Sequence, residues 1–103
     1  MNTDDVADEA VRPILRLYLA GDAPGARRAL EGRKRIIDAA SEPIDIEIID
    51  ILERPAEAEI AGILATPTLS DETVTPPRRL IGDISNTTQV LEYFGYGNKD
   101  ASG

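Results

Sequence analysis

The chain has 103 residues, a net charge of −8, and neither cysteine nor histidine. A chain of this length forms one domain, and its composition of 42% hydrophobic and 29% charged residues is typical of a soluble globular protein. Without cysteine there are no disulfides and no thiol catalysis, and without histidine the commonest metal ligand is missing. The negative charge argues against general nucleic-acid binding. No apolar run reaches the ~18 residues of a membrane span, and the acidic N-terminus is unlike a signal peptide, so we expect a cytoplasmic protein.

The first half of the chain predicts a strand, a helix and a second strand. Residues 13–20 ("PILRLYLA") are almost continuously apolar, which is typical of an interior strand. Residues 21–40 repeat small and apolar side chains at spacings of three and four, which predicts an amphipathic helix with Asp22 as its cap. Residues 44–52 ("IDIEIIDIL") alternate like a strand until a break in phase at Ile48–Ile49, which indicates a bulge or fuller burial.

The second half predicts a helix, a hairpin and a final helix. Pro55 suits a first helical turn, and the pattern around it predicts a helix over 54–64. Short strands are predicted from Thr68 and over 78–82, joined by a turn. Residues 85–95 predict a helix that Ser85 or Asn86 caps and Gly95 ends.

The predicted order is therefore β-α-β-α-β-β-α. The first two strands flank a helix and should be parallel, whereas the last two should form an antiparallel hairpin. The result is an α/β fold with a mixed sheet covered by helices on both faces, which is the thioredoxin-like arrangement. We expect a single domain over 13–95, with flexible tails at 1–12 and 96–103.

The residues that would carry chemistry in this arrangement are missing. Between the first strand and helix, where a thioredoxin carries two cysteines, the chain has "AGDAPGA". The same stretch lacks the lysine and hydroxyl of a phosphate-binding loop. Asp45 and Glu47 alternate along a strand and predict its solvated side rather than an acid–base pair. We therefore expect no enzymatic activity, no cofactor and no metal, and a function that lies in a surface or a conformational property.

Charge is distributed unevenly. Residues 24–40 contain five basic residues, including Arg28, and two acidic ones. Residues 42–59 contain seven acidic residues and one basic residue. Such patches can steer a partner or pair two copies, or they are solvated faces. Arg78 and Arg79 begin a strand and should point to opposite faces, one against a carboxylate and one as an exposed anchor for a partner. Ordinary surface arginines are the alternative.

Three prolines lie within eleven residues, at Pro67, Pro76 and Pro77. An X-Pro bond prefers trans by only about 0.5–1 kcal/mol and isomerises over tens to hundreds of seconds. The C-terminal half is therefore a candidate for slow conformational choice. The alternative is that the prolines are rigid turn-formers.

Four blocks in order resemble the KaiB family, the clock-associated partners of the KaiC ATPase: "LRLYLAGDAPGARRAL", "IIDILERP", "ILATPTL" and "PPRRLIGDIS". The resemblance implies a non-enzymatic protein with two folds that share the N-terminal half. One is the thioredoxin-like monomer that binds the hexameric KaiC ring and modulates its phosphorylation, ATPase activity or assembly. In the other, the C-terminal half is rearranged and the chain self-associates as a dimer or tetramer. Pro67, Pro76 and Pro77 lie in the switching half.

The resemblance also implies a KaiC-facing surface on the second helix and its approach, at Leu52, Glu53, Arg54, Ala56, Ala58, Ile60 and Ala61. The acidic character of this stretch would suit a basic groove on the ATPase. Cyanobacterial members carry lysine where this chain has Gly62 and Asp71 and end in a longer acidic tail. Positions linked to recruiting a third component, KaiA, are thus poorly kept. We expect a homologue from a two-component timer, unless these losses are neutral drift.

Two other functions remain open at this stage. A thioredoxin-like interaction module could serve a different receptor, such as a sensory kinase. An anion-dependent enzyme could use Arg78, Arg79 and the acidic strand, and it would require a small-molecule ligand.

Overall fold

The structure is a computed structural model that describes residues 13–99. Within that range the elements are β1 (Ile14–Leu19), α2 (Ala26–Ala39), β2 (Asp45–Asp50), α3 (Pro55–Ala61), β3 (Thr68–Asp71), β4 (Arg78–Ile81) and α4 (Thr87–Phe94). The predicted order β-α-β-α-β-β-α is confirmed. None of these helices is long and apolar enough to cross a membrane.

The four strands form one mixed sheet in the order β2-β1-β3-β4. β1 and β2 are parallel, while β3 is antiparallel to both β1 and β4, as the chain order predicted. The break in phase in β2 produces no bulge, because Leu17 and Tyr18 of β1 pair in continuous register with Ile48 and Ile49. Fuller burial accounts for it instead, since Ile49 is buried while Ile48 lies partly exposed.

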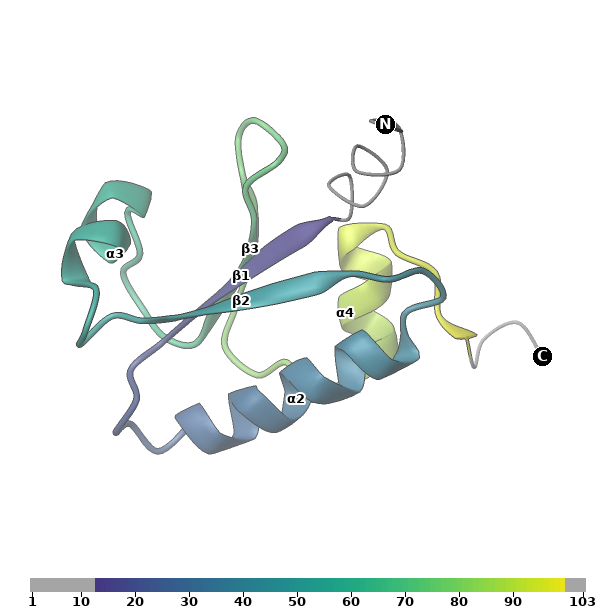
Figure 1. Cartoon of the computed structure of the whole chain (residues 1–103), viewed down its shortest axis with the longest axis horizontal. Helices are drawn as coiled ribbons and strands as arrows, with labels where there is room; N and C mark the ends of the chain where they lie inside the picture. The colour runs from purple at the N-terminus through teal and green to yellow at the C-terminus, as the bar shows by residue number, and fades with distance from the viewer. Residues whose placement is uncertain (1–12, 100–103) are drawn as a thin grey trace, which may run out of the picture.

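The helices cover the two faces of the sheet very unequally (Figure 1). α2 and α4 pack together over one face, which we call the core face, and Leu15, Leu17 and Leu69 point from it. α3 lies toward the opposite side, near the end of β2, and buries only Ala58 of its own residues. The opposite face, which carries Arg16, Tyr18, Ser70 and Arg79, is called the polar face below. Helices on both faces were predicted, but not this difference in cover.

α2 begins later than the sequence predicted, and Asp22 does not cap it. The helix starts at Ala26 with Gly25 at the N-cap position and no side-chain cap. The amides of Ala23 and Ala26 donate to the carbonyls of Ala20 and Ala23. The chain therefore makes tight turns before the helix, and Asp22 lies too early in the chain to reach it.

α3 is shorter than predicted, whereas α4 ends as predicted. α3 stops at Ala61 because Gly62 adopts a left-handed conformation with φ 72°, which glycine takes without strain. The Asn86 side chain accepts from the Gln89 amide at 3.1 Å, which confirms it as the cap of α4. Gly95, with φ 82°, ends α4 in the same left-handed way.

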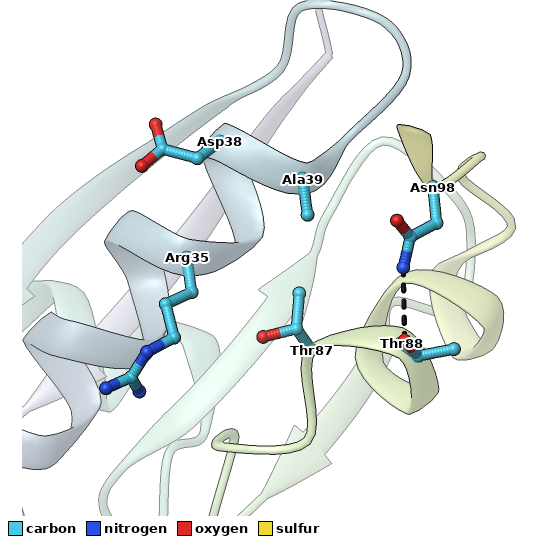
Figure 2. A pocket seen from close by; sticks show the side chains of 6 residues that line it. All are labelled: Arg35, Asp38, Ala39, Thr87, Thr88 and Asn98. Atoms are coloured by element: carbon cyan, nitrogen blue, oxygen red, sulfur yellow. Dashed lines mark hydrogen bonds between the residues drawn. The ribbon is translucent and has the colours of Figure 1, made fainter. Parts of the chain in front are cut away.

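Residues 96–99, which the sequence analysis assigned to a tail, contact the domain. Tyr96 packs against the core, and the carbonyl of Gly97 accepts from the amide of Ser41 at 3.0 Å. Asn98 donates to the Thr88 hydroxyl at 3.1 Å, in a hollow of about 310 Å³ between the end of α2 and the start of α4 (Figure 2). The predicted tails at 1–12 and 100–103 lie outside the described residues.

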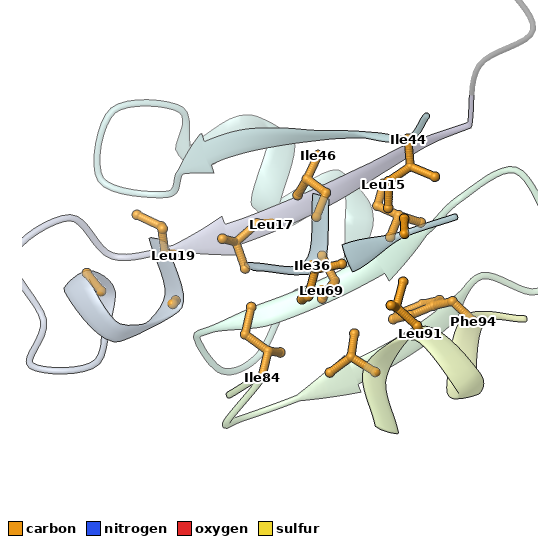
Figure 3. Close-up of a cluster of buried hydrophobic side chains, with 14 residues drawn as sticks. Leu15, Leu17, Leu19, Ile36, Ile44, Ile46, Leu69, Ile84, Leu91 and Phe94 are labelled. Atoms are coloured by element: carbon orange, nitrogen blue, oxygen red, sulfur yellow. The ribbon is translucent and has the colours of Figure 1, made fainter. Parts of the chain in front are cut away.

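The hydrophobic core lies between the core face and the helices α2 and α4 (Figure 3). β1 supplies Leu15, Leu17 and Leu19, which are alternate residues and therefore point to the same face of the sheet. Gly32 in the middle of α2 allows close packing, since a Cβ there would lie 3.0 Å from Ile84 Cγ1. The buried cluster consists of Leu15, Leu17, Leu19, Ala26, Ala29, Ile36, Ala40, Ile44, Ile46, Leu69, Ile84, Val90, Leu91 and Phe94.

A candidate partner-docking surface

The segment from Leu52 to Leu64, which we call the α3 surface, presents large apolar side chains to solvent. Leu52 is 57% exposed, Ile60 86% and Leu64 97%. A single exposed apolar side chain is common, but three within thirteen residues make this segment a candidate for a site that a partner covers.

Asp50, the last residue of β2, fixes the start of this surface. Its carboxylate accepts from the amides of Gly21 at 3.2 Å and Leu52 at 3.0 Å. Its carbonyl accepts from the amides of Glu53 and Arg54. A Cβ on Gly21 would overlap the Asp50 carboxylate, so a larger residue there would displace this side chain from its hydrogen bonds. Neither Asp50 nor Gly21 was predicted from the sequence as a site residue.

Charged side chains surround the apolar ones on α3. Arg54, at the N-cap position, donates to both oxygens of Glu57 in the first turn. This hydrogen bonding raises the pKa of the Arg54 guanidinium, so the side chain stays charged. Glu53 and Glu59 are exposed beside it. The surface is thus acidic overall, with its one arginine already paired.

The predicted KaiC-facing residues fall into two groups. Leu52, Glu53, Arg54, Ala56 and Ile60 are exposed. Ala58 is only 8% exposed and Ala61 is partly buried, so these two offer less surface to a partner. Ile63 and Leu64 follow the end of the helix, and Leu64 adds the most exposed of the large apolar side chains described.

The polar face beside α3 is organised by one carboxylate. Glu72 accepts from the Tyr18 hydroxyl at 2.8 Å, from Ser70 Oγ at 3.2 Å, from Arg16 Nη1 at 3.3 Å and from Arg79 Nη2 at 3.2 Å. Burial raises the pKa of the Tyr18 phenol, which therefore stays protonated as a donor. Within residues 13–99 no buried side-chain nitrogen or oxygen lacks a hydrogen-bond partner.

A groove of about 540 Å³ separates this cluster from α3. It is lined by Arg16, Glu57, Ile60, Ala61, Glu72, Pro77 and Arg79. The groove is open, so a partner that covers Ile60 would also meet the cluster around Glu72.

The three arginines predicted as interaction residues lie outside α3. Arg79 points to the polar face and pairs with Glu72, whereas Arg78 donates to the Tyr93 carbonyl of α4, so the predicted opposite directions are confirmed. Arg28 lies on the exposed side of α2. The pKa of the Asp83 carboxyl is lowered, chiefly because the amide of Ser85 donates to it. The positive charge of Arg28 lowers the same pKa further.

The three prolines bracket β3. Pro67 precedes that strand, and its carbonyl accepts from the amide of Gly82 at 2.9 Å. Pro76 and Pro77 are exposed in the loop between β3 and β4. Pro77 therefore lines the groove beside α3, whereas Pro67 lies at the opposite end of β3.

Gly62 and Asp71, the positions where the resemblance implied lysine in other members, both have local structural roles. Gly62 ends α3 through its left-handed conformation, as described above. Asp71 is 6% exposed, and its carboxylate accepts from the amide of Thr73 at 3.0 Å and from the Thr73 hydroxyl. These residues shape the turns on either side of β3.

The fold defines the class of protein to which the chain belongs. It resembles the solution structure of the N-terminal domain of Synechococcus elongatus SasA with a TM-score of 0.61, covering 82% of this chain and 84% of that one. At 22% identity this likeness shows the fold alone, a thioredoxin-like α/β domain. The chain has this fold without cysteine.

The sequence comparisons identify the family. The KaiB domain family model matches residues 16–95, so the chain belongs to the KaiB family. It is 43% identical to the circadian clock oscillator protein KaiB of Synechococcus elongatus, over 76% of this chain and 78% of that one. The KaiB of Nostoc punctiforme is also 43% identical, over 76% of each chain, and that of Trichodesmium erythraeum is 42% identical over the same shares.

Proposed function

We propose that this chain is a non-enzymatic, cytoplasmic clock protein that docks through the α3 surface on a hexameric KaiC-type ATPase and modulates its phosphorylation, ATPase activity or assembly. The observation that carries this proposal is the exposure of Leu52, Ile60 and Leu64 on a segment that Asp50 holds in place. Family membership supports the clock role.

The physical argument rests on what docking would bury. Burial of one large aliphatic side chain contributes about 1.5–3 kcal/mol, and this segment exposes three of them. Glu53, Glu57 and Glu59 lie in the same segment and favour a basic groove on the partner, which speeds the encounter and fixes its orientation. An apolar centre with a charged rim is the usual anatomy of a protein interface.

The proposal includes a second conformation. The structure presents β3 and β4 paired in the sheet, and we take this as the docking-competent state. In the other state, residues 62–95 repack and the chain self-associates as a dimer or tetramer. Two packings that differ by a few kcal/mol suffice for such a switch, and a sparse competent state lowers apparent affinity by its population. Pro67, Pro76 and Pro77 lie in the segment that would rearrange.

Size-exclusion chromatography with the KaiC homologue of the same organism and ATP tests the docking surface. Wild type should co-elute with the ring over hours. Ile60→Gln and Leu64→Gln should each weaken binding about tenfold or more, because each removes an anchor of the kind that dominates interfaces. Their melting temperatures should stay at the wild-type value, since both side chains are almost fully exposed.

Ile81→Gln is the matched control, because Ile81 is 65% exposed but lies on β4 rather than on α3. Absence of co-elution in every nucleotide and phosphorylation state would overturn the proposal. Equal loss of binding for all three variants would remove the α3 surface as the docking site. Tighter binding to a sensory kinase would favour the alternative receptor. KaiA is not expected to bind.

A further inference from the structure

Six charged side chains of alternating sign form a continuous series across the polar face. The links are Arg79 to Glu72 at 3.2 Å, Glu72 to Arg16 at 3.3 Å, Arg16 to Glu47 at 3.5 Å and Glu47 to Arg54 at 3.6 Å. The last link joins Arg54 to Glu57. We call this series the ion-pair chain.

The ion-pair chain connects two parts of the molecule, the edge strand β4 and the helix α3, that lie on opposite sides of β1 in the chain of links. It begins on β4, crosses the loop after β3, then β1 and β2, and ends in the first turn of α3. Arg79 reaches Glu72 only because β4 pairs with β3, which places Arg79 opposite Ser70. At the other end Arg54 holds Glu57 on the helix and Glu47 on the strand.

Packing alone does not fix α3 to the sheet. The helix has seven residues, of which only Ala58 is buried. A helix this short is marginal in water without tertiary contacts. Side-chain links to the sheet therefore make a larger fractional contribution to the order of α3 than they would for α2.

Resting on the proposed docking function, we propose that the ion-pair chain makes Arg79, Glu72, Arg16 and Glu47 positioning residues for the α3 surface. It couples the pairing of β4 in the sheet to the order of the helix that presents Ile60 to a partner. A rearrangement that withdraws β4 would then remove Arg79 from Glu72 and loosen the docking helix.

The size of the coupling follows from the exposure of the links. Their side chains are 25–42% exposed, so water and salt screen each pair. Loss of pairs of this kind shifts an opening equilibrium by roughly two- to five-fold. That range is too small to determine the fold but large enough to change the fraction of time for which α3 is ordered.

Amide hydrogen exchange of the free protein tests the coupling. Glu72→Gln removes the two ion pairs of Glu72 and keeps its length. We expect the α3 amides to exchange roughly two- to five-fold faster at low ionic strength, while α2 amides change less. At ~1 M salt, where the Debye length is ~3 Å, wild type and Glu72→Gln should exchange alike in α3.

Glu31→Gln is the control, because it removes the same charge from an exposed site on α2. Equal α3 exchange in Glu72→Gln and Glu31→Gln would overturn the proposal, as would a uniform acceleration of α2 and α3, which a purely structural role predicts. If Glu72→Gln fails to fold, a salt titration of wild type decides, since α3 protection must fall with salt more than α2 protection does. No partner is present in these measurements, so a negative result leaves the docking test with Ile60 and Leu64 untouched.

Discussion

Leu17 and Tyr18 are neighbours on the central strand β1, and both side chains are 0% exposed, yet they face different environments. Leu17 enters the dry cluster under α2 and α4. Tyr18 points to the polar face, where its hydroxyl donates to Glu72 and thereby contributes to a network of charges. The core face is therefore held by burial and shape, whereas the polar face is held by directional links that salt and pH can weaken. The surface proposed to meet a partner lies on the side of the polar face.

The largest effect should follow from a cavity on the core face. Leu17→Ala should lower the free energy of unfolding by about 2–5 kcal/mol, because it removes buried methyl groups and leaves a void among rigid neighbours. Urea denaturation followed by circular dichroism measures this. The slope with urea should stay constant if only stability changes. A loss below ~1 kcal/mol would mean that the core collapses around the void and that rigid packing does not distinguish the core face from the polar face.

The core face could be predicted from the sequence because local patterns determine it. The apolar run of β1, the helical spacing of α2 and the Asn86 cap of α4 each depend on neighbours within a few residues. Asp22 failed as a cap because the turns before α2 displace the helix start, which side-chain type alone does not reveal.

The polar face could not be predicted in the same way. Glu72 collects donors from β1, β3 and β4, which lie up to 56 positions from it in the chain. The sequence indicated that Arg78 or Arg79 would meet a carboxylate, but the strand register decides which arginine and which carboxylate. For α3, the apolar residues were visible in the sequence, whereas their exposure depends on where Gly62 ends the helix.

A smaller effect should follow from Tyr18→Phe, which tests the polar face at the adjacent residue. At neutral pH we expect a loss of about 0.5–1.5 kcal/mol for the missing hydrogen bond, with Glu72 still satisfied by three donors. In wild type, burial raises the pKa of the Tyr18 phenol above its ordinary value near ~10. The neutral phenol is thus favoured by folding.

The sign of the pH dependence follows from that shift. The contribution of Tyr18 to stability is fully present below the unfolded pKa and is lost as pH rises through the folded pKa. Wild-type stability should therefore fall more steeply than that of Tyr18→Phe above pH ~10. Tyr96, whose pKa burial also raises, gives a remaining decline in both proteins. Urea denaturation at several alkaline pH values measures the difference, and parallel curves would contradict the assignment.

The smallest effect on global stability should come from Gly62→Ala, at the end of the least-packed helix. Alanine in the left-handed conformation costs roughly 1–2 kcal/mol, and the less flexible unfolded chain offsets about 0.4–1 kcal/mol of that. Because α3 buries only Ala58, part of the strain can be released by fraying of the last turn without unfolding of the core. Faster exchange of the amides of Gly62 and Ile63, which donate to Glu59 and Ala58 in the native cap, should therefore exceed any change in α2. The exchange rates of these amides in Gly62→Asn should lie between those of wild type and Gly62→Ala, since asparagine tolerates this conformation better than alanine does. Slower exchange in Gly62→Ala would mean that the helix continues toward Leu64. The docking segment would then be more firmly ordered than a weakly packed α3 predicts.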